Sequence, residues 1–363
     1  MRRVDIVGGG IAGLTLAASL DPGRFQVTVH EAQPERAGGG AALGLWPAAR
    51  RALADLGAWE PLEPKVSEPG PAALHTLAGR PLVRVSSPPL AMVERAALLS
   101  ALDAAVPAQV RRVHADVADP AALAGDLVIG ADGVRSRVRA LVSPTAGERS
   151  GTPWVALRGI STRSQPRATP VGGEGVDRDA DEYQGLAEHG EFGEYWGPGR
   201  LFGLVPLSAG RVYWFTTHAE DLPEPLDPGQ VLDRARVRFA DAAPVVRRTL
   251  VEADPQGSVL ATRLWVAPPL TRYVRGRYVV IGDAAHASLP NLGRGACDAI
   301  VDAHTLARSL NGEDSLRRWQ AARVPVTQAA RLAAGAVMRL AVTARLRGRR
   351  DALLGTLGRV RTF

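Results

Sequence analysis

The sequence predicts an α/β fold in which a parallel sheet is interleaved with a smaller antiparallel sheet and followed by C-terminal helices. Three observations support this class. Short, continuously apolar runs near residues 4, 126 and 277 are typical of strands that are buried on both faces of a parallel sheet. Alternating patterns such as LFGLVPL and RVYWFTTH, between residues 151 and 265, indicate antiparallel strands. The last 40 residues or so are Ala-, Leu- and Arg-rich and read as helix.

The first element is a strand, glycine turn, helix and strand over residues 4–31. Gly8, Gly10 and Gly13, with Ala12 among them, occupy the spacing of a Rossmann-like dinucleotide turn. Glycine there permits the tight turn, the approach of a pyrophosphate and close helix packing, and the helix N-terminus attracts the phosphate. Glu31 ends the second strand, where an acid accepts hydrogen bonds from the adenosine ribose.

Two later segments return to the same sheet. Residues 126–139 (DLVIGADGVRSRVR) predict a buried strand followed by Asp132 and Gly133. Residues 277–310 predict another buried strand, then Gly282 and Asp283, then a loop and a long helix. A helix that starts near Gly295 directs its positive end at whatever precedes it, which would stabilise an anion there.

These three segments together resemble the single-component FAD monooxygenases of the p-hydroxybenzoate hydroxylase type, the group A flavoprotein monooxygenases, and the likeness extends to about residue 325. The resemblance implies FAD as the cofactor. It implies that Asp283 bonds the ribityl or pyrophosphate part, that Arg95 contacts the pyrophosphate side, and that Asp132 serves flavin and nicotinamide binding together. It also implies contacts to the cofactor from Arg36, Val117, Pro290, Gly293, Gly295 and Ala296.

The final motif departs from the family pattern at two positions, because Arg294 replaces a glutamine and Cys297 an asparagine. Arg294 either points to solvent or brings a cation near the flavin or an acidic substrate. Cys297 is predicted to be a small buried residue in a helix contact and not a reactive thiol. His286 is predicted to hold the loop by hydrogen bonds and not to act as a base.

The antiparallel region is predicted to cover the flavin, so the two domains alternate along the chain. We expect an FAD-binding domain from residues 1–70, 87–150 and 266–325, a substrate domain from 71–86 and 151–265, and a C-terminal helical segment from 326–363. The resemblance places the substrate between the sheet and the isoalloxazine. The candidate wall residues are Trp46, Arg158, Tyr195, Trp196 and Tyr213.

Composition restricts the class of protein. The 363 residues carry a net charge of +7 and one cysteine, so an intramolecular disulfide framework is excluded and a reducing cytoplasm is expected. The basic residues of the last helix, Arg331, Arg339, Arg345, Arg347, Arg349 and Arg350, are predicted to form a solvated face, and no nucleic-acid partner is expected. The apolar run 332–344 falls short of the roughly 20 residues that a membrane helix needs, so no stable membrane insertion is expected.

The resemblance implies an FAD- and NAD(P)H-dependent monooxygenase that uses O2 and a flavin C4a-hydroperoxide to hydroxylate or epoxidise a small aromatic or unsaturated substrate. No catalytic side chain and no metal is assigned. Alternatives on the same scaffold are a Baeyer–Villiger or oxidase reaction, or an FAD-bound scaffold for a non-oxygenating step such as cyclisation. The sequence leaves open the substrate, the choice between NADH and NADPH, and the oligomeric state.

Overall fold

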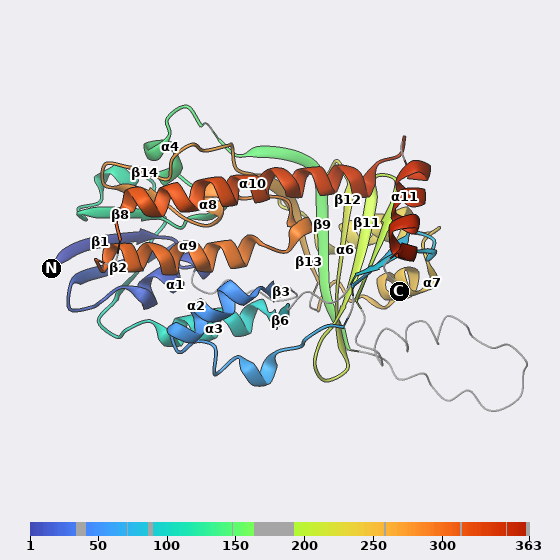
Figure 1. Cartoon of the computed structure of the whole chain (residues 1–363), viewed down its shortest axis with the longest axis horizontal. Coiled ribbons are helices and arrows are strands. Elements are labelled where there is room, and N and C mark those ends of the chain that lie inside the picture. Colours follow the sequence, from blue (N-terminus) through green and yellow to red (C-terminus); the bar gives the residue numbers. More distant parts are fainter. Residues whose placement is uncertain are drawn as a thin grey trace, which may run out of the picture.

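The structure is a computed structural model, and it describes residues 1–33, 41–70, 72–85, 90–146, 148–162, 192–257, 259–312, 314–345 and 347–360. Two sheets lie at opposite ends of an elongated molecule, with the N-terminus at the end of the first sheet and the C-terminus near the second (Figure 1). The long helix α10 (Leu316–Val342) extends from the first sheet to the second and so connects the two ends of the molecule.

The first sheet has six strands in the order β14-β15-β8-β1-β2-β7. All neighbours pair in parallel except β14 and β15. The strands are β1 (Arg2–Val7), β2 (Phe25–Glu31), β7 (Arg111–His114), β8 (Leu127–Gly130), β14 (Val274–Arg275) and β15 (Tyr278–Val280). The apolar runs that predicted buried strands fill the main core, in which Ile6, Val128 and Val280 are fully buried between helices.

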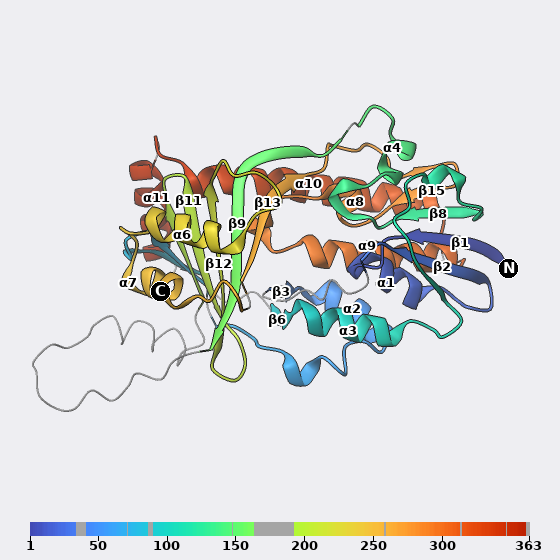
Figure 2. The same ribbon diagram turned by 180° about the vertical axis from the view of Figure 1, so that it is seen from behind.

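The second sheet has seven strands in the order β13-β9-β12-β11-β10-β4-β5, antiparallel apart from the β10–β4 pair. One face is covered by α6 (Pro228–Arg238) and α7 (Pro244–Glu252), which Figure 2 shows in front of the strands. The strands are β4 (Ala72–Thr76), β5 (Pro81–Val85), β9 (Ser150–Thr162), β10 (Phe192–Gly197), β11 (Arg200–Pro206), β12 (Arg211–Ala219) and β13 (Leu260–Val266). These two sheets, with the C-terminal helices, confirm the predicted fold class.

A two-stranded sheet of β3 (Ala42–Leu45) and β6 (Ala91–Glu94) lies between the large sheets. It packs on one side against a core shared by α2, α3 and α9. On the other side Ala42 and Met92 contact Val205 and Tyr213 of the seven-stranded sheet. This small sheet therefore joins the two ends of the molecule beside the predicted site.

The remaining helices follow the chain in order. They are α1 (Ile11–Ser19), α2 (Pro47–Asp55), α3 (Arg95–Ala105), α4 (Val138–Val142), α8 (Asp283–His286), α9 (Gly295–Leu310) and α11 (Arg347–Val360), with single 3-10 turns η1 (Glu63–Lys65), η2 (Pro120–Ala122), η3 (Gly133–Arg135) and η4 (Pro290–Leu292). Helix α10 continues through Pro325, so the helix itself crosses the expected boundary between residues 325 and 326. The division into domains stays a proposal.

The basic C-terminal helix is only partly a solvated face. Arg350 is 4% exposed, donates hydrogen bonds to the Leu340 and Ala341 carbonyl oxygens, and pairs with Asp351. The expectation of a wholly solvated face was therefore wrong at Arg350, because α11 packs against β5 and the end of α10. None of the helices in the described part of the chain combines the length and apolar composition that a membrane span requires.

Candidate cofactor and substrate site

The turn after β1 is built on glycines. Gly8 has a φ of +107°, which side chains other than glycine rarely adopt. A Cβ added at Gly13 would lie 1.9 Å from the Gly8 carbonyl oxygen, so helix α1 packs directly on the turn. A Cβ added at Gly10 would meet nothing within 4 Å. Gly10 is also the N-cap residue of α1, and it offers no side chain to accept from the first N–H groups of this helix.

Glu31 closes this turn from the end of β2. Its Oε2 accepts a hydrogen bond from the backbone N–H of Gly9 at 2.6 Å, and Oε1 accepts one from Gln33 at 2.7 Å. A carboxylate has about four acceptor sites, so these bonds leave room for further donors. Glu31 thus lies next to the glycine turn, as the motif predicts.

Asp132 follows β8, the next strand of the sheet. A Cβ added at Gly8 would lie 2.3 Å from the Ala131 carbonyl oxygen, so the segment that contains Ala131 and Asp132 packs on the glycine turn. Asp132 Oδ2 accepts a bond from the Arg137 N–H at 2.8 Å, while Oδ1 is buried and has no partner among the described residues. Burial raises the pKa of Asp132 above its ordinary value. A buried carboxyl oxygen without a partner is uncommon and points to a group that the protein binds here.

The loop after β15 reaches the same edge of the sheet. Gly282 has a φ of +57° and precedes Asp283, an exposed carboxylate. Pro290 begins η4, Gly293 has a φ of +58°, and Gly295 and Ala296 begin α9 without a side-chain cap. A Cβ on Gly295 would be 3.9 Å from Asp283 Oδ1. Because β1, β8 and β15 are neighbours and parallel, the three turns at their carboxyl ends lie at one edge, where open α/β sheets bind ligands.

Arg95 begins α3, directly after β6 of the small sheet that lies between the two large sheets. Burial lowers the pKa of Arg95, nearby Asp283 acts in the opposite direction, and Arg158 of β9 lowers it again. Arg95 therefore lies within electrostatic range of both Asp283 and Arg158. Val117 follows β7, the last strand in the order of this sheet, and its carbonyl oxygen accepts a bond from Arg137 Nη1 at 2.8 Å. Arg36 lies outside the described residues.

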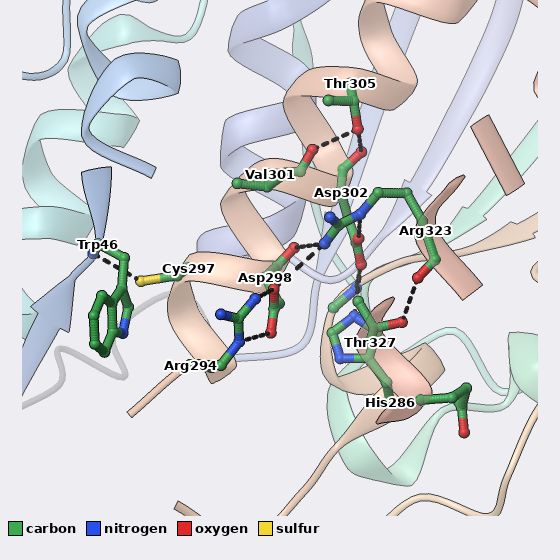
Figure 3. A network of polar contacts seen from close by, with 12 residues as sticks. Trp46, His286, Arg294, Cys297, Asp298, Val301, Asp302, Thr305, Arg323 and Thr327 are labelled. Atoms are coloured by element: carbon green, nitrogen blue, oxygen red, sulfur yellow. Dashed lines mark hydrogen bonds and ion pairs between the residues drawn. The ribbon is translucent and has the colours of Figure 1, made fainter. Parts of the chain in front are cut away.

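The two residues that depart from the family pattern are both partnered (Figure 3). Arg294 forms an ion pair with Asp298, 2.9 Å away and one helical turn along α9, so it neither extends freely into solvent nor lies unpaired. Cys297 is buried; it donates to the Gly44 carbonyl oxygen at 3.1 Å and accepts from the Trp46 N–H at 3.3 Å. Burial raises the pKa of Cys297 to about 11, so the thiol is protonated at neutral pH. These contacts support its interpretation as a packing residue.

His286 belongs to a buried polar network (Figure 3). Its Nε2 lies 2.6 Å from Asp302 Oδ2, which also accepts from the Gly282 N–H at 3.0 Å. Arg323 donates to Asp302 Oδ1 at 2.6 Å. The network ties the loop after β15 to α9 and α10. This geometry supports the expectation that His286 holds the loop.

The candidate wall residues divide between two faces of the seven-stranded sheet. Arg158, Tyr213 and Trp196 lie on the face that is turned away from α6 and α7, as their contacts with β3–β6 and α10 indicate. Tyr195 was assigned wrongly. It is fully buried on the opposite face, where it stacks on His75 at 4.8 Å and packs against Phe202. Trp46 lies at the start of α2, and its Nε1 is buried without a partner among the described residues.

Sequence reasoning missed two residues on the site face, Phe215 and Glu194. Phe215 is the cross-strand partner of Arg158, and Glu194 is two residues before Trp196. Strand alternation could have found both, because residues two apart share a face. Glu194 Oε2 accepts a bond from the Trp196 indole N–H at 2.7 Å.

Comparisons with known proteins agree with this geometry. Residues 1–315 match the family model described as FAD binding domain. Aurachin C monooxygenase/isomerase of Stigmatella aurantiaca is 32% identical over 351 residues, covering 88% of this chain and 85% of the relative. Salicylate hydroxylase of Pseudomonas putida is 31% identical over 392 residues, covering 90% and 83%. The crystal structure of Klebsiella pneumoniae HpxO complexed with FAD and uric acid has the same fold, with a TM-score of 0.80 and 24% identity over 98% of this chain and 93% of that one.

The fold and the ligand-binding edge define a dinucleotide-binding flavoprotein. The chain belongs to the FAD binding domain family, and its relatives are FAD-dependent monooxygenases and hydroxylases of group A. The resemblance inferred from the three motifs is thereby confirmed. The residues present fit FAD on three observations: the open space at Gly10, the uncapped starts of α1 and α9, and the unpartnered Oδ1 of Asp132.

Proposed function

We propose that this chain is an FAD- and NAD(P)H-dependent monooxygenase that inserts one oxygen atom of O2 into a small aromatic or unsaturated substrate, by hydroxylation or epoxidation. The observation that carries the proposal is the shared edge at the carboxyl ends of β1, β8 and β15, beside the small β3–β6 sheet, which packs against Val205 and Tyr213 of the second large sheet. The two halves that such a reaction needs, a cofactor edge and a substrate face, are therefore adjacent. We further propose a cytoplasmic protein, in keeping with its single buried cysteine.

The first motif would hold the pyrophosphate and ribose of FAD. The open N-terminus of α1, with Gly8, Gly10, Ala12 and Gly13, supplies backbone N–H groups and a positive dipole for a phosphate anion. Glu31 would accept from the ribose hydroxyls, Val117 would contact adenine through its backbone, and Arg36 would close over the ribose edge. Arg95 and Asp283 would contact the pyrophosphate side and the ribityl chain.

The loop before α9 would lie against the flavin ring. Pro290, Gly293, Gly295 and Ala296 present backbone at the uncapped helix start, which favours negative charge without any reorganisation. Asp132 would serve flavin and nicotinamide binding. When bound, FAD supplies the redox chemistry, accepting electrons from NADH or NADPH and delivering them to O2.

The side chains of the second sheet would position the substrate and exclude water. Arg158, Tyr213 and Trp196 share the face that packs against β3–β6 and α10, which would be turned toward the cofactor, and Trp46 contacts Cys297 near the start of α9. Holding the reacting carbon in a fixed position removes the entropic cost of bringing two reactants together. No side chain is needed as a redox group, and the protonated Cys297 offers none.

The test is anaerobic mixing of the FAD-loaded protein with NADH or NADPH, followed at the flavin band near ~450 nm. We expect one donor to bleach the band and added oxygen to restore it with turnover when an aromatic compound is present. If neither donor reduces the flavin, even with aromatic compounds present, the proposal fails and an oxidase or a non-oxygenating scaffold remains.

A further inference from the structure

Helix α10 presents an apolar face to the outside of the molecule. In Figure 1 the helix lies on the near side, and in Figure 2 the strands of the second sheet pass in front of it. The whole helix belongs to the described part of the chain, and its exposed residues between Arg318 and Arg339 are Ala321, Ala322, Pro325, Val326, Ala329, Leu332, Ala333 and Ala336. A surface helix usually carries polar residues on its outer side, so this face is suited to a partner.

Six of the exposed residues repeat at intervals that alternate between four and three positions. We call them the Ala322–Leu340 row, and they are Ala322, Val326, Ala329, Ala333, Ala336 and Leu340. This spacing is the one that the a and d positions of a coiled coil follow, so the six side chains share one line along the helix. The row is about 27 Å long at the ~1.5 Å rise per residue of an α-helix. Helix α10 continues through Pro325, which flanks the row.

The opposite side of α10 is the one that packs on the protein. Thr327, Ala334 and Met338 are buried there. Met338 packs in one cluster with Trp196, and its sulfur lies 3.6 Å from Nδ2 of Asn291 in η4. The row therefore faces away from the proposed cofactor and substrate site and leaves that site free.

The arginines of α10 near the row are turned away from it. Arg323 donates to Asp302 at 2.6 Å in the buried network, and Arg331 donates to Gln328 at 3.1 Å. A Cβ added at Gly335 would lie 3.7 Å from Nη1 of Arg339, so this guanidinium lies back along the flank of the helix. No charge therefore has to be buried when the row is covered.

The row is self-complementary when two copies of α10 run antiparallel about residue 331. In that register Ala322 faces the partner's Leu340, Val326 faces the partner's Ala336, and Ala329 faces the partner's Ala333. Each of the larger side chains meets an alanine, so the helices can approach closely. Every pairing is also reciprocal, as the interface of a twofold-symmetric dimer requires.

We propose that the Ala322–Leu340 row is a self-association surface, which binds the same row of a second copy of this chain antiparallel across a twofold axis. A lipid surface fits the row less well, because four of its six residues are alanine, whereas helices that lie on membranes insert Trp, Phe and Leu. A contact one helix wide and about 27 Å long buries on the order of 300–500 Å² per copy, less than the roughly 800 Å² of a standard interface. The dimer is therefore weak.

Sedimentation velocity of the FAD-loaded full-length protein, from ~1 to ~200 μM, measures the self-association. We expect the sedimentation coefficient to rise with concentration, with a dissociation constant on the order of 10–100 μM. Each copy carries a net charge of +7, so salt should strengthen the dimer by screening the repulsion between copies. Binding of the protein to an anionic surface would weaken with salt instead.

Two variants test the row. Ala329→Glu places a carboxylate against the partner's Ala333 at two symmetric positions and should weaken self-association at least about tenfold. Ala321→Glu is the matched control, because Ala321 is an exposed alanine of the same helix outside the row, and this variant should associate as the native protein does. Melting temperatures of both variants check that the monomer is intact.

A mixture of two variants tests the register. Ala333→Lys alone should also be monomeric, but in a mixture with Ala329→Glu the new carboxylate at position 329 meets the new ammonium group at position 333 of the other copy. Association should then recover. A parallel pairing would place position 329 against position 329 and give no recovery.

The inference is overturned if the native protein stays monomeric at every concentration, if Ala329→Glu associates as the native protein does, if Ala321→Glu loses association equally, or if the mixture shows no recovery. Co-sedimentation of a monomeric native protein with phosphatidylglycerol vesicles, lost in Ala329→Glu, would assign the row to a lipid surface and would also overturn it. None of these measurements uses flavin reduction, so they stand apart from the test of the proposed function.

Discussion

Glu31 Oε2 accepts a hydrogen bond from the backbone N–H of Gly9 across 2.6 Å, so the acid that ends β2 fixes the glycine turn that ends β1. The residue proposed to bind the ribose is thus also part of the structure that shapes the phosphate site. A substitution at Glu31 should therefore affect both the ribose contact and the shape of the phosphate site.

Replacing this acid should weaken cofactor binding strongly. Glu31→Gln keeps the shape of the side chain but loses the charge that strengthens its bonds to N–H and hydroxyl donors, a difference of about 1–1.5 kcal/mol per bond or roughly 5- to 10-fold in FAD affinity. Titration of the apoprotein with FAD, followed by flavin fluorescence, measures it. Asp254→Asn is the control, because Asp254 also accepts a backbone bond, from Gln256 at 2.9 Å, but in a surface turn. Equal affinities for the native protein and Glu31→Gln would contradict the assignment.

The glycines of the turn should separate folding from binding. A methyl group at Gly10 meets nothing within 4 Å, so Gly10→Ala should leave the melting temperature of the apoprotein unchanged and yet weaken FAD binding by about tenfold or more through contact with the phosphates. Gly13→Ala should lower both the melting temperature and the FAD affinity, since its methyl group would overlap the Gly8 carbonyl. Gly355→Ala, also in open space but on α11, is the control. Native FAD affinity in Gly10→Ala would place the phosphates elsewhere.

Cys297 should be inert in the folded protein. Its thiol is buried and its pKa is raised to about 11, so the reactive thiolate is scarce at mildly alkaline pH. A chromogenic disulfide reagent should label no thiol in the native state and one thiol after unfolding in guanidinium chloride. Cys297→Ser should retain flavin reduction. Rapid labelling of the native protein would show instead that the start of α9 opens readily.

The His286–Asp302 pair should give a stability that depends on pH. Burial alone would lower the pKa of His286, but the charge of Asp302 and their hydrogen bond outweigh it and hold that pKa above the ordinary 6.5. Asp302 shows the reverse, since His286 and Arg323 hold its pKa below 3.8 against the effect of burial. A raised histidine pKa stabilises the folded state at low pH, and the contribution disappears as the pH rises through the folded value.

As the pH rises from about 6.5 through the raised pKa of His286 in the folded state, the free energy of unfolding should therefore fall more in the native protein than in His286→Asn. Denaturant titration of both proteins at several pH values measures the difference between their free energies of unfolding. The contributions of the other ionisable groups cancel in this difference. Asp302→Ala should cost about 3–5 kcal/mol, because it leaves a buried arginine and histidine without their partner. A His286→Asn difference that does not change with pH would mean that the imidazole stays neutral.

The sequence predicts those parts of the site that depend on local spacing. Gly8, Gly10 and Gly13, Glu31 and Asp283 follow strands whose apolar runs are unmistakable, so their shared edge follows from parallel pairing. Strand alternation likewise implies that Tyr195 and Trp196 face opposite ways. Which of them faces the cofactor is decided by where α6, α7 and α10 pack, and no local pattern contains this information. Arg350 was misplaced for the same reason. Glu194 was missed because, in the sequence alone, it looks like an ordinary surface acid.

The central claim is tested most directly with oxygen of a heavy isotope. The FAD-loaded protein, its effective nicotinamide donor and labelled O2 are incubated with each aromatic compound that accelerates donor oxidation, and the products are analysed by mass spectrometry. The account predicts a product that contains one labelled oxygen atom, with the second atom of O2 released as water. A compound that accelerates donor oxidation but yields only hydrogen peroxide, or a product without label, would contradict it.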